Sequence, residues 1–80
     1  MPLTVAERKH LMPHGAQKEV AEAEGVGVSY VSAVMAGEVF PKTEPSRQKL
    51  RRVQRALARK LGRTIADAFP ETVHAEAAVA

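Results

Sequence analysis

Five side chains in one short segment are of the types that contact the edges of DNA bases. Ser29 can donate a hydrogen bond to a base acceptor or a phosphate, and Tyr30 can reach a phosphate with its hydroxyl. Val28 and Ala33 offer methyl groups for contact with a thymine methyl, and Ser32 is short enough to allow close approach. The segment has no Arg, Asn or Gln for a bidentate base contact, so base preference would come from methyl contacts and DNA shape. The alternative for Tyr30 is half-buried packing at a helix edge.

Basic side chains are concentrated after this segment. Residues 41–63 hold nine Lys and Arg and a single Glu, whereas the parts before and after are net acidic. This asymmetry is typical of a polyanion-binding surface. Like charges that recur at four-residue steps repel on a helix, which favours an external anion as their partner. The alternative is a solvated basic face that only aids solubility. The four-residue row consists of Arg47, Arg51, Arg55 and Arg59.

Two short helices around a glycine are expected to position the segment. The sequence predicts a helix over 16–24 that ends at Gly25, where a left-handed residue costs glycine nothing. A second helix is expected over 28–36, with Gly27 as its N-cap and Gly37 after its end.

The apolar residues of these helices recur at helical spacing. Val20 and Ala21 share one face of the first helix, while Val31, Val34 and Met35 share one face of the second. The small Ala21 lets two backbones approach at a steep crossing. The pattern therefore predicts a helix-turn-helix whose second helix turns its remaining side chains outward.

The stretch from residue 17 to residue 37 resembles the Cro/phage-repressor type (XRE) helix-turn-helix family. The residues that carry the resemblance agree in both type and spacing, and they are Gln17, Val20, Ala21, Gly25, Val26, Val31, Ser32, Val34 and Gly37. The resemblance implies an all-α fold, a compact lambda-repressor-like DNA-binding domain of four to five helices. It also implies a sequence-specific regulator of transcription, a repressor, that binds double-stranded DNA as a homodimer.

The same resemblance implies phosphate contacts on both sides of the second helix. Gln17 would grip a phosphate at the start of the first helix, where free N–H groups and the helix dipole favour an anion. The alternative is a plain surface glutamine. The loop after the second helix would lie along the DNA backbone. The full set of predicted DNA-binding residues is Gln17, Lys18, Val28, Ser29, Tyr30, Ser32, Ala33, Lys42, Thr43, Arg47 and Arg51.

Three further helices are predicted around this unit. Thr4 and Glu7 form a capping box for a helix over 4–12. Residues 38–45 should form a loop, with its hydrophobic pair Val39 and Phe40 against the core.

After that loop, Ser46 is expected to begin a helix that runs to residue 61 with an apolar stripe. Thr64 caps a last helix over 65–69, which Pro70 stops. The domain is thus expected over 1–70, and the Ala-rich residues 71–80 are expected to be frayed or disordered. The stripe is Leu50, Val53, Leu57 and Leu61.

Composition excludes several other classes. Eighty residues make one small domain, and the absence of cysteine excludes disulfides and Cys-based zinc sites and suits a reducing cytoplasm. No signal peptide or membrane-length apolar run is present, so we expect a cytoplasmic protein that does not bind membranes. His10 and His14 are separated by Pro13, and with His74 they lack metal-site spacing, so neither metal nor cofactor is expected. We expect no enzyme, because the chain has no recognisable nucleophile–base pair, no phosphate-binding glycine loop and too little volume for a pocket.

Four alternatives stay open at this stage. The lactose-repressor family shares similar core residues, but its helix-turn-helix begins almost at the N-terminus and continues into a sugar-binding domain. A small helical protein–protein adaptor would use the arginine row to bind an acidic partner. An antitoxin-type module fits the same size, and an Arg-rich helix can also bind RNA, although aromatic stacking platforms are missing.

Overall fold

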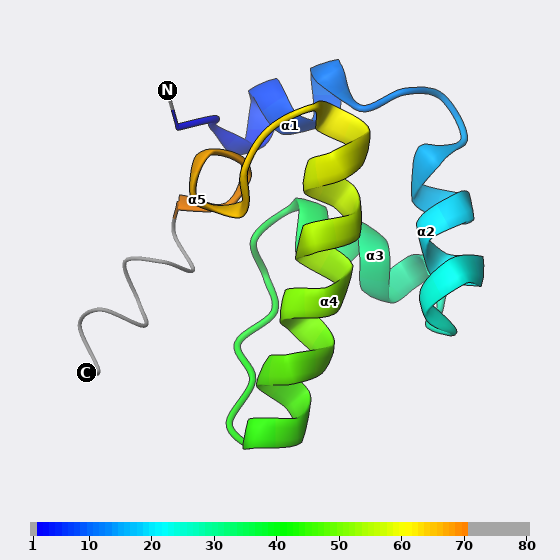
Figure 1. Cartoon of the computed structure of the whole chain (residues 1–80), viewed down its shortest axis with the longest axis vertical. Helices are drawn as coiled ribbons and strands as arrows, with labels where there is room; N and C mark the ends of the chain where they lie inside the picture. Colours follow the sequence, from blue (N-terminus) through cyan, green and yellow to red (C-terminus); the bar gives the residue numbers. More distant parts are fainter. Residues whose placement is uncertain (1, 71–80) are drawn as a thin grey trace.

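A computed structural model describes residues 2–70, which form five helices and no strand (Figure 1). The all-α prediction is therefore confirmed over this range, and the expectation for residues 71–80 lies outside the described part of the chain. The described helices pack into a body of 35 × 29 × 17 Å. They are α1 (Val5–Leu11), α2 (Ala16–Glu24), α3 (Val28–Met35), α4 (Glu44–Leu61) and α5 (Ile65–Ala68).

The predicted capping box is present at the start of α1. The Thr4 hydroxyl accepts a hydrogen bond from the Glu7 N–H at 3.1 Å, and a Glu7 carboxylate oxygen accepts one from the Thr4 N–H at 3.0 Å. Two backbone donors of the first turn are thereby satisfied. Leu3, just before the cap, is buried and donates its N–H to the Asp67 carbonyl at 2.7 Å. This bond ties the N-terminal segment to α5.

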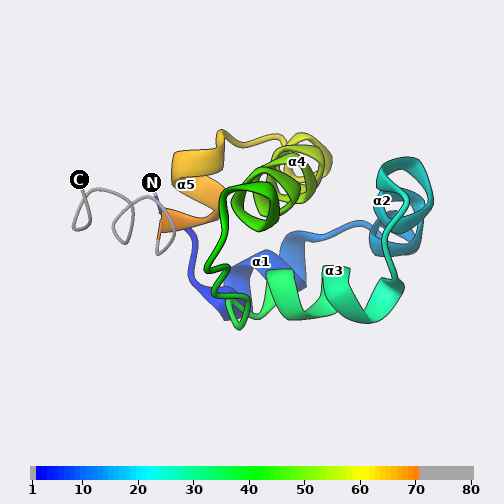
Figure 2. The same cartoon turned by 90° about the horizontal axis from the view of Figure 1, so that it is seen from below.

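The helix pair α2 and α3 has the predicted boundaries to within one residue. Gly25 ends α2 with φ of 66°, in the left-handed region that favours glycine. Gly27 is the N-cap of α3 and, having no side chain, makes no capping hydrogen bond. Figure 2 shows α2 nearly end-on while α3 runs across the page, so the two helices cross steeply. Val26, in the turn between them, packs against the core.

α4 begins two residues before the predicted start at Ser46. Thr43 is its N-cap, because the Thr43 hydroxyl accepts the Ser46 N–H at 3.4 Å. Pro45 lies in the first turn, where a helix needs no N–H donor from it, so proline does not prevent helix here. The expectation that all of 38–45 is loop was wrong for this reason.

One apolar cluster joins α2, α3, α4 and α5. The predicted stripe of α4 points into it, with Leu61 at its partly buried edge, and Phe69 is fully buried just after α5. The expectation that Val39 and Phe40 both lie against the core was right for Val39 and wrong for Phe40. Val39 packs against the cluster, whereas Phe40 is 80% exposed. The buried members are Val20, Ala21, Val31, Val34, Met35, Leu50, Val53, Leu57, Ala58, Ala68 and Phe69.

Candidate nucleic-acid interface

α3 has one face locked into the core and one face open to solvent. Val31, Val34 and Met35 are buried in the central cluster. Ser29 and Ser32 are exposed on the other side of the same helix. The helix is thus held by its apolar side and presents short polar side chains outward, as the sequence pattern predicted.

The remaining predicted residues of α3 lie at the borders of this open face. Val28 is 51% exposed, although it is a large apolar side chain, and Ala33 is half-buried. The methyl groups of both residues are therefore accessible from outside.

Tyr30 is half-buried and connects α3 to α4. The Lys49 ammonium lies over the Tyr30 ring, 4.4 Å from its centroid, a cation–π contact. Burial raises the pKa of the Tyr30 phenol above its usual value, so the hydroxyl stays protonated and able to donate a hydrogen bond at neutral pH. The alternative expectation, that Tyr30 packs half-buried at a helix edge, therefore holds for its ring. The contact with Lys49 also places a cation beside α3.

Lys49 was absent from the predicted site. Its only signal in the sequence is its position directly before Leu50, which places it on a flank of the buried stripe of α4. Which flank faces α3 depends on how the two helices cross, and periodicity does not contain that information.

The start of α2 presents Gln17 half-buried and Lys18 exposed. The N-cap before them is Gly15, which contributes no capping side chain. The neighbouring Glu19 is bound to Lys60 of α4, whose hydrogen bond and positive charge lower the pKa of the Glu19 carboxyl. One carboxylate on α2 is therefore turned toward α4 and paired.

The loop residues Lys42 and Thr43 are both exposed. The Thr43 hydroxyl is already engaged, because it accepts from the Ser46 N–H and donates to the Ser46 hydroxyl at 2.9 Å. Its role as the cap of α4 competes with a role as a phosphate donor. Lys42 carries the charge of this loop.

The structure does not bring Arg47 and Arg51 to the side of α4 where Lys49 meets Tyr30. Each lies two residues from Lys49, and residues two apart leave a helix in nearly opposite directions. Arg47 instead contacts Glu44, one turn earlier, at 3.3 Å. The predicted residues thus fall into two groups, one on α3 with Lys49 nearby and one elsewhere on α4.

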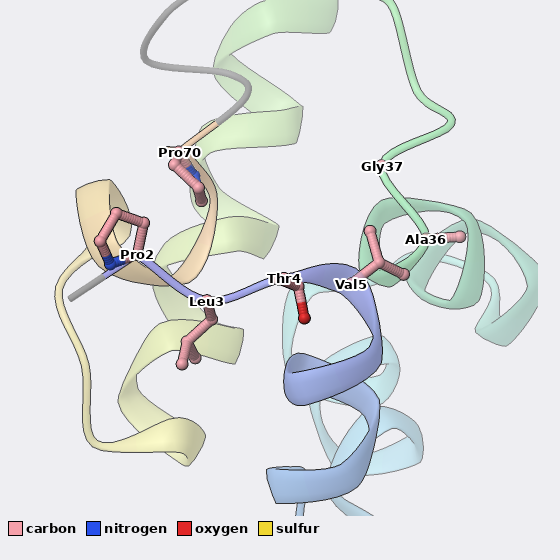
Figure 3. A pocket seen from close by; sticks show the side chains of 7 residues that line it. All are labelled: Pro2, Leu3, Thr4, Val5, Ala36, Gly37 and Pro70. Atoms are coloured by element: carbon pink, nitrogen blue, oxygen red, sulfur yellow. The ribbon is translucent and has the colours of Figure 1, made fainter.

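An open apolar hollow of about 550 Å³ lies between the N-terminal segment and the end of α3 (Figure 3). The expectation that the chain has too little volume for a pocket was therefore wrong. No lining side chain of this hollow titrates, so it offers no acid or base for catalysis. Its walls are Pro2, Leu3, Thr4, Val5, Ala36, Gly37 and Pro70.

Within residues 2–70, no cluster of three His, Cys, Asp or Glu has metal-site geometry. His10 and His14 are exposed, and His74 lies outside the described residues. None of the helices described here combines the length and the apolar character needed to cross a bilayer.

Comparison of the chain with protein-family models, with curated proteins and with solved structures found no match.

Proposed function

We propose that this chain is a sequence-specific double-stranded DNA-binding regulator of transcription, a repressor, that places α3 in the major groove. The observation that carries the proposal is the division of α3 into a core face and an open face of short polar and methyl side chains. A helix anchored on three buried residues is already ordered before it meets a ligand, so binding costs little conformational entropy. The steeply crossed α2–α3 pair supports assignment to a lambda-repressor-like helix-turn-helix.

Lys49 supplies what α3 itself lacks, a cation next to the face that would meet DNA. Phosphate contacts provide most of the affinity of such proteins, while base edges provide selectivity. In this proposal Lys49 joins Gln17, Lys18 and Lys42 as a phosphate contact. Ser29, together with the other open-face side chains of α3, reads the groove.

A single α3 spans only a few base pairs, so we propose that the protein acts as a homodimer. Two copies related by a two-fold axis would place their α3 helices on half-sites about one helical turn, roughly 34 Å, apart. The operator would then be palindromic.

Selection of bound duplexes from a random pool tests the proposal directly. A palindromic consensus is the expected result, and it would establish both base reading and two-fold assembly. Absence of any enrichment would contradict sequence-specific binding. Failure to bind random duplex DNA even at low salt would favour the adaptor, in which the arginines of α4 bind an acidic protein.

Variants of α3 and α4 separate base reading from phosphate binding. Ser29→Ala and Tyr30→Ala are expected to lower selectivity between preferred and unrelated sites, because each removes a side-chain hydroxyl that this proposal assigns to DNA contact. Lys49→Ala is expected to weaken binding to all DNA sequences alike and to reduce the slope of log affinity against log salt concentration by about one. Tyr30→Phe keeps the ring beneath Lys49 and removes only the hydroxyl, so it should lower selectivity as Tyr30→Ala does without losing the contact with Lys49. If the preferred site is unchanged in the Ser29 and Tyr30 variants, α3 is not the reading helix.

A further inference from the structure

The outer side of α4 carries arginines that the proposed contact of α3 does not use. Three of them follow a buried apolar residue of the stripe by two positions, so they leave the helix on the side opposite the core. All are exposed. We call this set the outer arginine face, and it consists of Arg52, Arg55 and Arg59, with Arg51 at its edge.

The outer arginine face and the open face of α3 point in different directions. Figure 2 shows α3 and α4 in separate layers, and the buried stripe of α4 lies between the outer arginine face and α3. The open face of α3 points away from the same cluster, because Val31 and Val34 on its other side are buried there. One straight duplex lying against α3 would therefore leave the outer arginine face uncovered.

The charges of Arg52, Arg55 and Arg59 have no compensation within the described residues. No acidic residue occurs between positions 46 and 63. No ion pair or hydrogen bond joins Arg52, Arg55 or Arg59 to another side chain in residues 2–70. Arginines three and four residues apart on one helix repel each other, and an external anion removes that repulsion.

The chemistry of the face fits a nucleic-acid backbone better than a protein. Protein interfaces also use arginine, but they combine it with buried aromatic or other apolar anchors at their centre, and no such anchor accompanies the outer arginines on this face. A polyanion needs no such anchor, because release of its condensed counterions supplies the affinity. α4 has 18 residues and is about 27 Å long, so the face spans several successive phosphates.

We propose that the outer arginine face is a second, sequence-independent surface for duplex DNA, so that one protein holds two duplexes at once. The bridging part of this inference rests on the proposed function of α3, whereas duplex binding by α4 does not. Guanidinium groups hydrogen-bond phosphate oxygens in a forked geometry, which suits this role.

A bridging assay with the full chain tests the proposal. A duplex is fixed to beads, the protein is added, and capture of a fluorescent duplex of unrelated sequence is measured. The wild-type protein is expected to capture it. Arg52→Gln/Arg59→Gln is expected to reduce capture at least about tenfold and to lower the salt slope of capture by about two, while binding of the first duplex in solution changes less than about threefold.

A control variant with the same loss of charge elsewhere makes the result specific. Lys9 on α1 and Arg63 after α4 are both exposed. Lys9→Gln/Arg63→Gln should retain capture, and equal loss in this control would reduce the effect to net charge and overturn the proposal. Circular dichroism of both double variants verifies that they are folded.

The remaining outcomes are also decisive. Capture that persists in Arg52→Gln/Arg59→Gln would mean that bridging comes from a dimer with two α3 helices, and the proposal would be wrong. Displacement of the fluorescent duplex by polyglutamate more readily than by unlabelled duplex would assign the face to an acidic protein instead. If Ser29→Ala and Tyr30→Ala leave site preference intact while the arginine variant loses duplex binding, the reading role of α3 fails and the surface on α4 stands.

Discussion

At the scale of single residues, Arg8 is the least expected feature of this protein. Its side chain is 0% exposed and its guanidinium donates to the Met35 carbonyl at 2.8 and 3.1 Å and to the Ala68 carbonyl at 2.9 Å. The same group lies over the Phe69 ring, 4.6 Å from its centroid. The two carbonyls belong to the last residues of α3 and α5, where helix dipoles favour a positive charge. Arg8 therefore joins α1 to the ends of two other helices.

Replacing Arg8 should be strongly destabilising. Arg8→Met keeps the bulk but leaves buried carbonyls without their charged donor, so we expect a loss of about 2 to 4 kcal/mol in the free energy of unfolding. Urea denaturation of the wild-type protein and of Arg8→Met measures this difference in the free energy of unfolding. The exposed neighbour provides a control, since Lys9→Met should change stability by less than about 0.5 kcal/mol. Equal effects in the two variants would show that the Arg8 hydrogen bonds do not stabilise the fold.

Phe40 presents the opposite case, a large apolar side chain in solvent. Because it is 80% exposed, Phe40→Ser should leave the free energy of unfolding within about 0.5 kcal/mol of wild type. Val39→Ser should cost more, because Val39 packs against the core cluster. Thermal melts of the two variants make the comparison. A large loss in Phe40→Ser would mean that the ring is buried in solution, against another part of the chain or a second copy.

At the scale of elements, local caps define where the helices begin. The hydrogen bonds that Glu7 accepts from the Thr4 backbone and side chain lower the pKa of the Glu7 carboxyl, and Arg63 contributes in the same direction. The bond to Lys60 lowers the pKa of the Glu19 carboxyl. A carboxyl with a depressed folded pKa adds stability above its unfolded pKa, and that stability is lost as pH falls through the folded pKa.

The protein should therefore become less stable as the pH drops below the ordinary carboxyl value of 4.5. Glu7→Gln keeps an acceptor for the capping box but removes the titrating group, so its stability should vary less with pH over this range. Chemical denaturation at a series of pH values between neutral and acidic gives both curves. Identical pH dependence in wild type and Glu7→Gln would exclude a contribution of the capping box to acid sensitivity.

At the scale of the whole molecule, one cluster connects four of the five helices, and Arg8 attaches the fifth. With no second core among the described residues, we expect a single cooperative unfolding transition. The protein has one tyrosine and no tryptophan, so intrinsic fluorescence reports the contact of Tyr30 with α4. The unfolding transition measured by fluorescence should coincide with the loss of helix measured by circular dichroism.

Leu57→Ala tests this cooperativity. Leu57 is fully buried near the C-terminal end of α4, and its truncation should cost about 2 to 5 kcal/mol. Because the cluster is shared, fluorescence and circular dichroism should shift together to lower denaturant concentration. Gln48→Ala, an exposed change on the same helix, should shift neither. Separated transitions would indicate that α3 unfolds independently of α4.

The sequence alone determined where the described helices lie and which sides of α2, α3 and α4 are buried. Helix ends depend on residues within four positions of one another, as in the pair Thr4 and Glu7 or the turn at Gly25, so a local pattern suffices. The start of α4 was misplaced for an equally local reason, since Thr43 caps the helix and its first turn accepts proline. DNA binding by α3 stays a prediction that the exposed residues support.

Only the tertiary structure decided which side chains from different helices meet. Arg8 occupies a position of α1 at helical spacing from Val5 and Met12, yet its burial depends on carbonyls 27 and 60 residues away along the chain. The crossing of α3 and α4 placed Lys49 on Tyr30 and turned the outer arginines away from α3. Periodicity identifies the face of a helix but not its neighbour, because the neighbour is set by how all the buried faces pack together.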